Sequence, residues 1–486
     1  MTRAALAFLL PLLLITPAAV AEPAKTPKVL VIGLDGARYD KLLSADTPNI
    51  HALLDHGYGA RSALYGSGMA QTSSGPGWST VLTGVWPDKH KVKDNSFAGN
   101  ALASHPSWLE RANTANPALS TYAAVDWKPI GDQILRNGQD RKYVLDGDTA
   151  GYTGSDEKIT VDAEQHLRTN AADASFVYLG QIDIAGHDHG ADSSQYAAAM
   201  RTNDAQIGRL ISAIESRPSY AAEDWLIMLT TDHGHTAAGG HGGDSPEERM
   251  TFAISTGSAR PAVAPKLVDV AATALKHLNV SASSDGYALG TAPLDAFDSV
   301  TLQPRQDETG VPASVLGWTH RGPAGWTVTT ASSMPQGVAE WQGWSFTTDD
   351  FWTRTAPSQQ REVNVRARGV FAVADPDEWD DKGSPSSRGK FDSTMTSPAY
   401  DVTGKSSVRL EYGSHYRQED AQTGTVSVSF DGGPAQIVKT HNVDGLAQQI
   451  SLTVTVPSGA RTVKASWRLF DAGNNWYWAV DAPRLS

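Results

Sequence analysis

The sequence predicts an α/β domain built on a mostly parallel sheet, followed by an all-β sandwich. From Pro27 to about Thr291, short apolar runs alternate with helical patterns. Beyond Gly325, short strands of alternating polarity are separated by turns. Strand, helix, strand in series is typical of parallel sheets, whereas many alternating short strands are typical of a sandwich. The length of 486 residues allows two or three domains, each with its own core.

In the first half, three apolar runs predict buried strands, at Lys28–Leu34, Ser175–Gly180 and Trp225–Thr230. Between the last two runs, Gln195–Ser216 places Ala, Met, Ile and Leu at helical spacing. We therefore expect parallel strands joined by crossover helices. Tyr287–Leu289 is interpreted as part of a final strand.

In the second half, four alternating runs predict antiparallel strands, at 407–412, 425–430, 450–456 and 462–467. Nine of the 14 tryptophans lie from Trp318 onward, enough aromatic bulk for a separate core. The ending Asn474–Asp481 resembles jelly-roll modules appended to secreted hydrolases. Contact with a glycan or a protein is a hypothesis for this domain.

The amino-terminal segment is interpreted as a secretory signal peptide. Arg3 precedes an apolar run from Ala4 to Ile15, and Ala19-Val20-Ala21 is a small-x-small cleavage pattern. No later stretch of 18 apolar residues was found, so we expect no membrane span. The predicted location is periplasmic or extracellular.

The predicted domain boundaries follow these changes of pattern. They are a signal peptide at 1–21, a catalytic domain at 22–295, a linker at 296–325 and a β-sandwich at 326–486.

The composition narrows the classes of function. Lys and Arg number 40 and Asp and Glu 53, giving a formal charge of −13, which argues against sequence-specific nucleic-acid binding by a basic surface. The chain has no cysteine, which excludes disulfides, thiolate metal sites and a cysteine nucleophile. A small anionic substrate remains compatible, because bound metal reverses the local sign of charge.

Three aspartates directly follow the three predicted strands: Asp35, Asp183 and Asp232. In a parallel sheet they emerge together at the carboxyl edge, where open α/β folds place their sites. Each alone is more often a helix cap or a turn residue. The group carries more weight because glycine or histidine lies near each member.

Histidines accompany these aspartates. His187 follows Asp183 by four residues, His233 is adjacent to Asp232, and His241 lies in a glycine-rich loop. Oxygen and nitrogen ligands without sulfur suit zinc, or manganese less selectively. Together these residues predict two adjacent metal sites.

A nucleophile candidate lies in the segment Thr72–Gly84, where hydroxyl side chains precede Pro76 and a helical pattern. A hydroxyl at a helix amino terminus has backbone N–H groups directed at any phosphate that it attacks. A loop with a capping serine is the alternative. Local composition does not choose among Thr72, Ser73 and Ser74.

Several motifs in series resemble the alkaline phosphatase superfamily, and within it the nucleotide pyrophosphatase/phosphodiesterase branch. They are Gly33-Leu34-Asp35-Gly36, the hydroxyl-x-Pro segment running into Leu82–His90, Asp94-Asn95, Asp183 with His187, Asp232-His233, and His241. The resemblance covers Lys28 to Leu289. It implies a mixed, mostly parallel sheet sandwiched by helices.

The resemblance also implies roles for individual residues. Asp183, His187 and His241 would hold one zinc ion, and Asp35, Asp232 and His233 the other. Ser74 would be the nucleophile, with its oxygen on the second zinc, and Ser73 is the alternative. Asn95 would donate a hydrogen bond to a phosphoryl oxygen. Gly77 stands where many relatives carry Asn, and His235 and His90 have no implied ligand role.

The sequence leaves the substrate open between phosphodiesters or nucleotide pyrophosphates and phosphomonoesters. Monoesterases need added positive charge for a dianion, and the candidates are Lys93, Lys128 and Arg141. Without a clear clamp, we favour diesters. Trp78 replaces the arginine of a sulfatase motif, which argues against a sulfatase. A surface binding protein with a degenerate catalytic domain is the alternative of another class.

Overall fold

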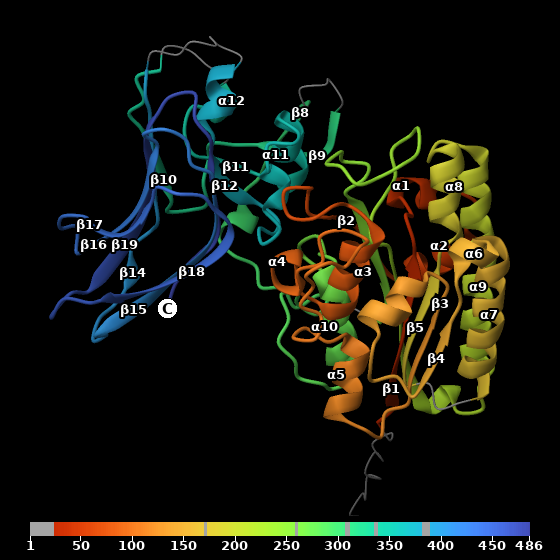
Figure 1. Cartoon of the computed structure of the whole chain (residues 1–486). Helices are drawn as coiled ribbons and strands as arrows, with labels where there is room; N and C mark the ends of the chain where they lie inside the picture. The colour runs from red at the N-terminus through yellow and green to blue at the C-terminus, as the bar shows by residue number, and fades with distance from the viewer. Residues whose placement is uncertain (1–23, 170–172, 258–260, 307–311, 335–338, 382–388) are drawn as a thin grey trace, which may run out of the picture.

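The computed structural model describes residues 24–169, 173–257, 261–306, 312–334, 339–381 and 389–486. The predicted signal peptide at 1–21 lies outside these residues. Two bodies lie side by side, an α/β body from the first half of the chain and a β-rich body from the second (Figure 1).

The α/β body contains a seven-stranded sheet in the order β2-β7-β6-β1-β5-β3-β4. The strands from β6 to β4 are parallel, while β7 and β2 are antiparallel to their neighbours. The predicted mixed, mostly parallel sheet is therefore confirmed. The strands are β1 Thr26–Leu34, β2 Gly57–Ala63, β3 Thr121–Val125, β4 Arg141–Val144, β5 Ala174–Leu179, β6 Glu223–Thr230 and β7 Met250–Thr256.

Helices cover both faces of this sheet (Figure 1). One face carries α1 Tyr39–Ser44, α2 Pro48–His56, α7 Tyr152–Thr169, α8 Gln181–His189 and α9 Ser194–Glu215. The other carries α3 Ser74–Thr83, α5 Trp108–Ala115 and α10 Val268–His277. Shorter elements are α4 Pro87–His90, α6 Gly147–Ala150, a π-turn at Ile130–Ile134 and a 3₁₀ turn at Tyr220–Ala222.

The central strand β1 shows why the apolar run predicted a buried strand. Val29 and Val31 point into the core beneath α3 and α10, whereas Leu30, Ile32 and Leu34 point into the core beneath α2 and α9. All five are 0% exposed. A strand covered on both faces reads as continuous apolar sequence, and this burial fixes the position of Asp35 at its end.

The β-rich body consists of two antiparallel sheets, confirming the all-β prediction. One has the order β10-β13-β19-β16-β17 with β14 beside β19, and the other the order β11-β12-β20-β15-β18. The strands are β10 Thr327–Thr330, β11 Ser345–Thr347, β12 Phe371–Ala374, β13 Phe391–Thr396, β14 Tyr400–Asp401, β15 Ser407–Tyr416, β16 Thr423–Phe430, β17 Gln436–His441, β18 Gly445–Thr455, β19 Thr462–Ala472 and β20 Trp478–Leu485.

The segment between the two bodies contains local secondary structure. It contains a 3₁₀ turn at Phe297–Ser299 and the hairpin β8 Gln303–Gln306 with β9 Pro312–Trp318. Phe297 is buried against Trp326 and Phe346 in the second core. Tyr287–Leu289 is not a strand, so that prediction is wrong. This segment lies against α10, where the Tyr287 amide donates to Asp269.

Arginine–aspartate pairs join the two bodies. Arg368 donates both terminal guanidinium nitrogens to Asp269 of α10, at 2.7 and 2.9 Å. Arg249 reaches Asp349 of α11 Asp349–Thr355. The 3₁₀ turn η5 Arg361–Val363 packs on the loop before α3, because a Cβ on Gly66 would lie 2.5 Å from Cβ of Glu362. The second body therefore supports the loop that leads into Ser74.

The remaining elements of the second body are a 3₁₀ turn at Ala339–Trp341 and α12 Pro376–Asp381. In the described part of the chain, no helix is both long and apolar enough to cross a membrane.

Candidate metal and nucleophile site

Three neighbouring parallel strands, β5, β1 and β6, bring the predicted aspartates to one edge. Asp35 follows β1 directly, Asp183 lies in the first turn of α8 after β5, and Asp232 lies two residues beyond β6. The register pairs Leu34 with Leu179 and Gly33 with Thr230. Because parallel strands end together, the three carboxyl groups converge at the carboxyl edge.

The first group of side chains, which we call the buried group, consists of Asp35, Asp232 and His233. Their exposure is 1%, 0% and 0%. His233 Nε2 lies 3.5 Å from Asp35 Oδ1 and 3.3 Å from Asp232 Oδ2. Neither of these two oxygens has a hydrogen-bond partner among the described residues. Buried carboxylate oxygens left in this way need a cation or a proton.

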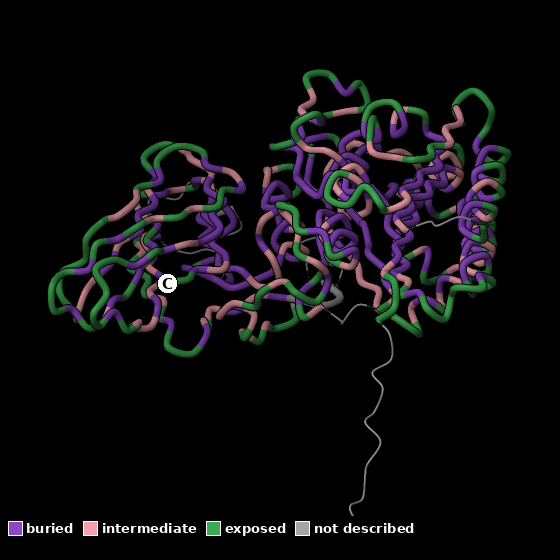
Figure 2. The backbone as a smooth tube through the Cα atoms, turned by 90° about the horizontal axis from the view of Figure 1, so that it is seen from below, coloured by how far each residue is buried: buried purple, intermediate pink, exposed green. Residues whose placement is uncertain are grey.

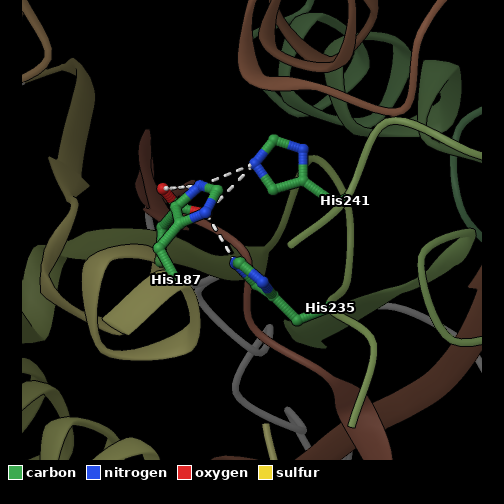
Figure 3. A group of neighbouring side chains, drawn as sticks. His187, His235 and His241 are labelled. Atoms are coloured by element: carbon green, nitrogen blue, oxygen red, sulfur yellow. Dashed lines mark hydrogen bonds and ion pairs between the residues drawn. The ribbon is translucent and has the colours of Figure 1, made fainter. Parts of the chain in front are cut away.

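The second group, which we call the open group, consists of Asp183, His187, His235 and His241. His241 Nε2 lies 3.0 Å from His187 Nε2, and His235 Nε2 lies 2.7 Å from Asp183 Oδ1. The three imidazole rings converge from α8 and from the chain after β6 (Figure 3). The His187 side chain is 43% exposed, so solvent reaches this group at His187. In both bodies, buried backbone lies mostly in the interior and exposed backbone mostly in the outer turns (Figure 2).

Burial and crowding set the protonation of both groups. Burial raises the pKa of Asp35, Asp183 and Asp232 above the ordinary aspartate value, and neighbouring carboxylates raise those of Asp183 and Asp232 further. Burial lowers the pKa of His241 to about 2. Neutral imidazoles beside crowded carboxylates are the state in which both bind metal.

These donors fit divalent cations. Two sets of side chains each offer ligand atoms that lie within 4.8 Å of one another. One set is Asp183, His187, His235 and His241, and the other is Asp35, Asp183 and His233. Imidazole nitrogens with carboxylate oxygens are ligands that zinc takes at catalytic sites. A dication in the buried group would satisfy Oδ1 of Asp35 and Oδ2 of Asp232, the two oxygens without partners.

Ser74 lies beside the buried group. Its Oγ is 3.4 Å from His233 Nε2, and it is the first residue of α3. Ser73 precedes the helix, and its Oγ has no hydrogen-bond partner among the described residues. Thr72 is engaged elsewhere, since its Oγ1 donates to the Gly243 carbonyl at 2.9 Å. Of the three hydroxyls, the structure brings that of Ser74 to the buried group.

Asn95 is held against the start of α3. Its Oδ1 accepts the Gly75 amide at 2.7 Å. Because a backbone N–H must meet the oxygen of a side-chain amide, this contact leaves the nitrogen of Asn95 as the remaining donor. That donor lies next to the nucleophile candidate. The Gly75 amide itself is occupied by this bond.

The three basic residues considered as binders of a monoester dianion have other partners in the structure. Lys128 is exposed and paired with Asp132. Arg141 begins β4, at the amino edge of the sheet, and is paired with Asp162. Lys93 donates to the Met69 carbonyl, and burial lowers its pKa.

Sequence reasoning missed three contacts at the site. His235 belongs to the open group through Asp183, although the motif order gave it no ligand role. Trp78 and Tyr178 both donate to Asp35. His235 lay within the motif Asp232–His235, a signal that was available. The two aromatic residues lie inside a helix and a strand, where a core role is the usual interpretation.

A cleft of about 1120 Å³ lies between the two bodies, lined by Trp86, Tyr287, Asp295, Arg368, Asp481 and Arg484 among others. None of the buried or open group lines it. The chemistry predicted from the sequence is therefore separate from this cleft.

Comparison with known families agrees with the geometry. Residues 29–266 match the family described as type I phosphodiesterase / nucleotide pyrophosphatase. This match identifies residues 29–266 as a domain of this branch of the alkaline phosphatase superfamily. The match runs from Val29 within β1 to beyond the end of β7 and includes both groups and Ser74.

Curated relatives match the same region. GPI ethanolamine phosphate transferase 2 of Schizosaccharomyces pombe is 25% identical over 247 residues, 48% of this chain and 31% of that protein. Ectonucleotide pyrophosphatase/phosphodiesterase family member 3 of Rattus norvegicus is 26% identical over 43% of this chain and 25% of its own length. Human member 7 is 23% identical over 45% and 50%. The chain thus spans a quarter to a half of these relatives.

Among solved structures, murine ectonucleotide pyrophosphatase/phosphodiesterase 5 aligns with a TM-score of 0.42 at 15% identity. The alignment covers 53% of this chain and 97% of that one.

Proposed function

We propose that this protein is an exported phosphoric ester hydrolase that uses two zinc ions and a phosphoseryl intermediate on phosphodiesters or nucleotide pyrophosphates. The observation that carries the proposal is Ser74 Oγ at the start of α3, 3.4 Å from His233 of the buried group. Family membership supports the reaction class. Asp35, Asp232 and His233 would hold one zinc, and Asp183, His187 and His241 the other, with His235 bonded to Asp183.

The residues of the chain suggest a two-step displacement. Ser74 Oγ attacks phosphorus, forming the Ser–O–P bond as the bond to the leaving oxygen breaks. The serine proton leaves with that alcohol or phosphate. Water then cleaves the phosphoseryl bond, releasing a phosphomonoester and restoring the serine. Bound zinc would lower the pKa of attacking hydroxyls and neutralise charge on phosphate oxygens.

Asn95 would stabilise the transition state from the remaining side. Its side-chain nitrogen would donate to a nonbridging phosphoryl oxygen as charge builds there. Its orientation is set by the bond from the Gly75 amide. Removing one such preorganised donor typically costs on the order of 10²–10³-fold in kcat, so we expect a loss of this size for Asn95→Ala.

A diester or pyrophosphate is favoured over a monoester because the candidate cations have other partners. Lys128 is paired with Asp132, Arg141 with Asp162, and Lys93 with the Met69 carbonyl. A monoester dianion carries one more charge than a diester and needs such a cation free. The alternative on the same site is an alkaline phosphomonoesterase.

The nucleophile is tested with two neighbouring serines. Ser74→Ala should retain zinc and lose turnover by at least about 10⁴-fold, in the range seen when covalent nucleophiles are removed. Ser73→Ala is the matched control and should remain active. Turnover by Ser74→Ala with loss in Ser73→Ala would transfer the role to Ser73.

The substrate class is tested by comparing bis-p-nitrophenyl phosphate with p-nitrophenyl phosphate, using zinc-loaded protein of known metal content. A higher kcat/KM for the diester supports a phosphodiesterase. A strong monoester preference supports the phosphomonoesterase. Zinc at two equivalents without turnover of either ester would support a surface binding protein with a degenerate catalytic domain.

Export is part of the proposal and has its own test. Cleavage after Ala21 would give a secreted or periplasmic protein that begins at Glu22. Amino-terminal sequencing of the natively produced protein should return Glu22. Recovery of intact Met1 from the cell interior would contradict export. A glycan- or protein-binding role for the second body remains a prediction.

A further inference from the structure

We infer that Trp78 and Tyr178 are positioning residues that hold Asp35 as a one-oxygen metal ligand and join the nucleophile helix to that ligand. The inference rests on the proposed function for its metal, but its contacts stand on the geometry alone. The resemblance described above assigns no role to either residue.

Asp35 has two differently used oxygens. Its Oδ2 accepts the Tyr178 hydroxyl at 2.5 Å and the Trp78 indole N–H at 2.8 Å. Its Oδ1 has no hydrogen-bond partner among the described residues and faces His233 Nε2 at 3.5 Å. With Oδ2 occupied by two donors, the carboxylate is free to offer a cation one oxygen, on the side of Ser74.

The two donors are rigid. Trp78 is 0% and Tyr178 is 2% exposed, and their rings pack edge to face with centroids 5.3 Å apart. Trp78 also packs edge to face on Phe176. Side chains packed in this way have few alternative rotamers, so both donors are aimed before any metal binds.

Trp78 transmits the position of α3 to the metal ligand. It lies four residues after Ser74, one helical turn along α3. Its six-membered ring covers Gly33 of β1, where a Cβ would meet Trp78 Cη2 at 2.4 Å. Gly33 therefore provides the space that lets the indole reach Asp35.

A second contact fixes the same helix to the other buried carboxylate. A Cβ on Gly77 would lie 2.7 Å from Cβ of Asp232 and 2.8 Å from its carbonyl oxygen. The first turn of α3 thus lies directly on Asp232 through Gly77 and reaches Asp35 through Trp78. Gly77 and Trp78 are adjacent positions in the sequence. The positions of Ser74 and of both carboxylates in the buried group are therefore coupled through the packing of α3.

The contrasting interpretation is that Trp78 is simply a core aromatic. The two interpretations differ in what the indole N–H does, so the test removes the N–H and keeps an aromatic ring. Trp78→Phe and Tyr178→Phe each delete one donor to Oδ2. Tyr178→Phe retains the entire ring and guards against a folding defect in the other variant.

Trp108→Phe is the matched control. Trp108 is also 0% exposed, lies in the same core and has an indole N–H without a hydrogen-bond partner among the described residues. It makes the same loss of ring volume without loss of a donor to a ligand.

The primary measurement is the zinc dissociation constant of each variant, by competition with a chromophoric chelator. Loss of an outer partner of a metal ligand typically costs about 10–100-fold in affinity. In Trp78→Phe and Tyr178→Phe, we expect a loss in this range for the zinc ion that Asp35 would hold. In Trp108→Phe, we expect no loss of zinc affinity. The absorption bands of the Co²⁺-substituted protein should shift in the same two variants.

Unchanged zinc affinity and an unchanged Co²⁺ spectrum in Trp78→Phe and Tyr178→Phe would overturn the inference, even if activity fell. Equal losses in Trp108→Phe would overturn it as well, because they would reflect core packing. If no phosphoester is turned over but zinc affinity still falls in the two variants, the proposed function fails and the positioning role stands.

Discussion

The buried group and the open group share one sheet edge but are built differently. Asp35, Asp232 and His233 are buried. The side chains of Trp78 and Tyr178 orient Asp35 by donating hydrogen bonds to its Oδ2. In the open group, the His187 side chain is 43% exposed, and His241 comes from a glycine-rich loop that is bonded to Thr72 through His241, Gly242 and Gly243. One cation would therefore meet a preformed, buried site, and the other a site that is completed by a loop.

The largest expected difference concerns charge. Asp232→Asn and His187→Ala should both abolish turnover, but Asp232→Asn should raise the Tm of the metal-free protein. Asp232 is crowded by Asp35 and Asp183, which raise its pKa together with burial. Relief of such a buried charge is worth on the order of 1–4 kcal/mol, and each kcal/mol shifts Tm by about 2–4 °C in a domain of this size.

His187→Ala serves as the control for this experiment. The His187 side chain is partly exposed, so its removal should do little to relieve the repulsion among the buried carboxylates. Differential scanning calorimetry of chelator-treated protein is the measurement. A lower Tm for metal-free Asp232→Asn would show that the carboxylate contributes more through its bond from the Gly36 amide than it costs by repulsion.

Metal removal should proceed in two stages. The open group should release its zinc first on dialysis against a chelator, because water and chelator reach His187 directly. The buried group should follow slowly, with activity already lost. Zinc content and activity sampled over time provide the measurement, and simultaneous release of both equivalents would contradict the comparison.

Two buried histidines outside the site test the effect of burial on protonation without any metal. Burial lowers the pKa of His90 and of His415 to about 3, from an ordinary value of 6.5. Below pH 6.5 the unfolded chain binds these protons and the folded protein does not. The free energy of unfolding therefore falls by about 1.4 kcal/mol per pH unit for each histidine, from pH 6.5 down to about 3.

Denaturant unfolding between pH 7.5 and 4.5 measures this slope. His415→Gln should reduce this slope relative to that of the unsubstituted protein, because it removes one of the two buried imidazoles. An unchanged slope in His415→Gln would mean that another group dominates acid unfolding.

The smallest effect is expected at Lys128. Its ammonium group is exposed and paired with Asp132, so Lys128→Ala should leave kcat/KM for both esters unchanged. Steady-state kinetics check this. A selective loss of monoester hydrolysis would show that Lys128 leaves Asp132 to bind the dianion, and the preference for diesters would have to be reversed.

Much of the site was predictable because the strand ends carry it. Asp35, Asp183 and Asp232 each follow an apolar run, and strand order alone places them together. The bonds from Trp78 and Tyr178 to Asp35 were not predictable, because they join positions 43 and 143 residues apart. Such contacts depend on how α3 packs on the sheet, which no local pattern encodes.

The fold shows the same division. The apolar runs predicted β1, β5 and β6, but β2, with the sequence GYGARSA, has no strand pattern. It is a strand because β7 pairs with it along its full length. Tyr287–Leu289 has a short apolar pattern and yet forms no strand, since its backbone bonds to side chains of α10 instead.

The central place of β1 has a consequence for how the chain folds. Its sheet partners are remote, since Val29 pairs with Ala174 and Thr26 with Glu223, separations of 174 − 29 = 145 and 223 − 26 = 197 residues. Contacts of this range form late and slow the folding rate. The first strand of the domain therefore stays without its sheet partners until β5 and β6 have been synthesised.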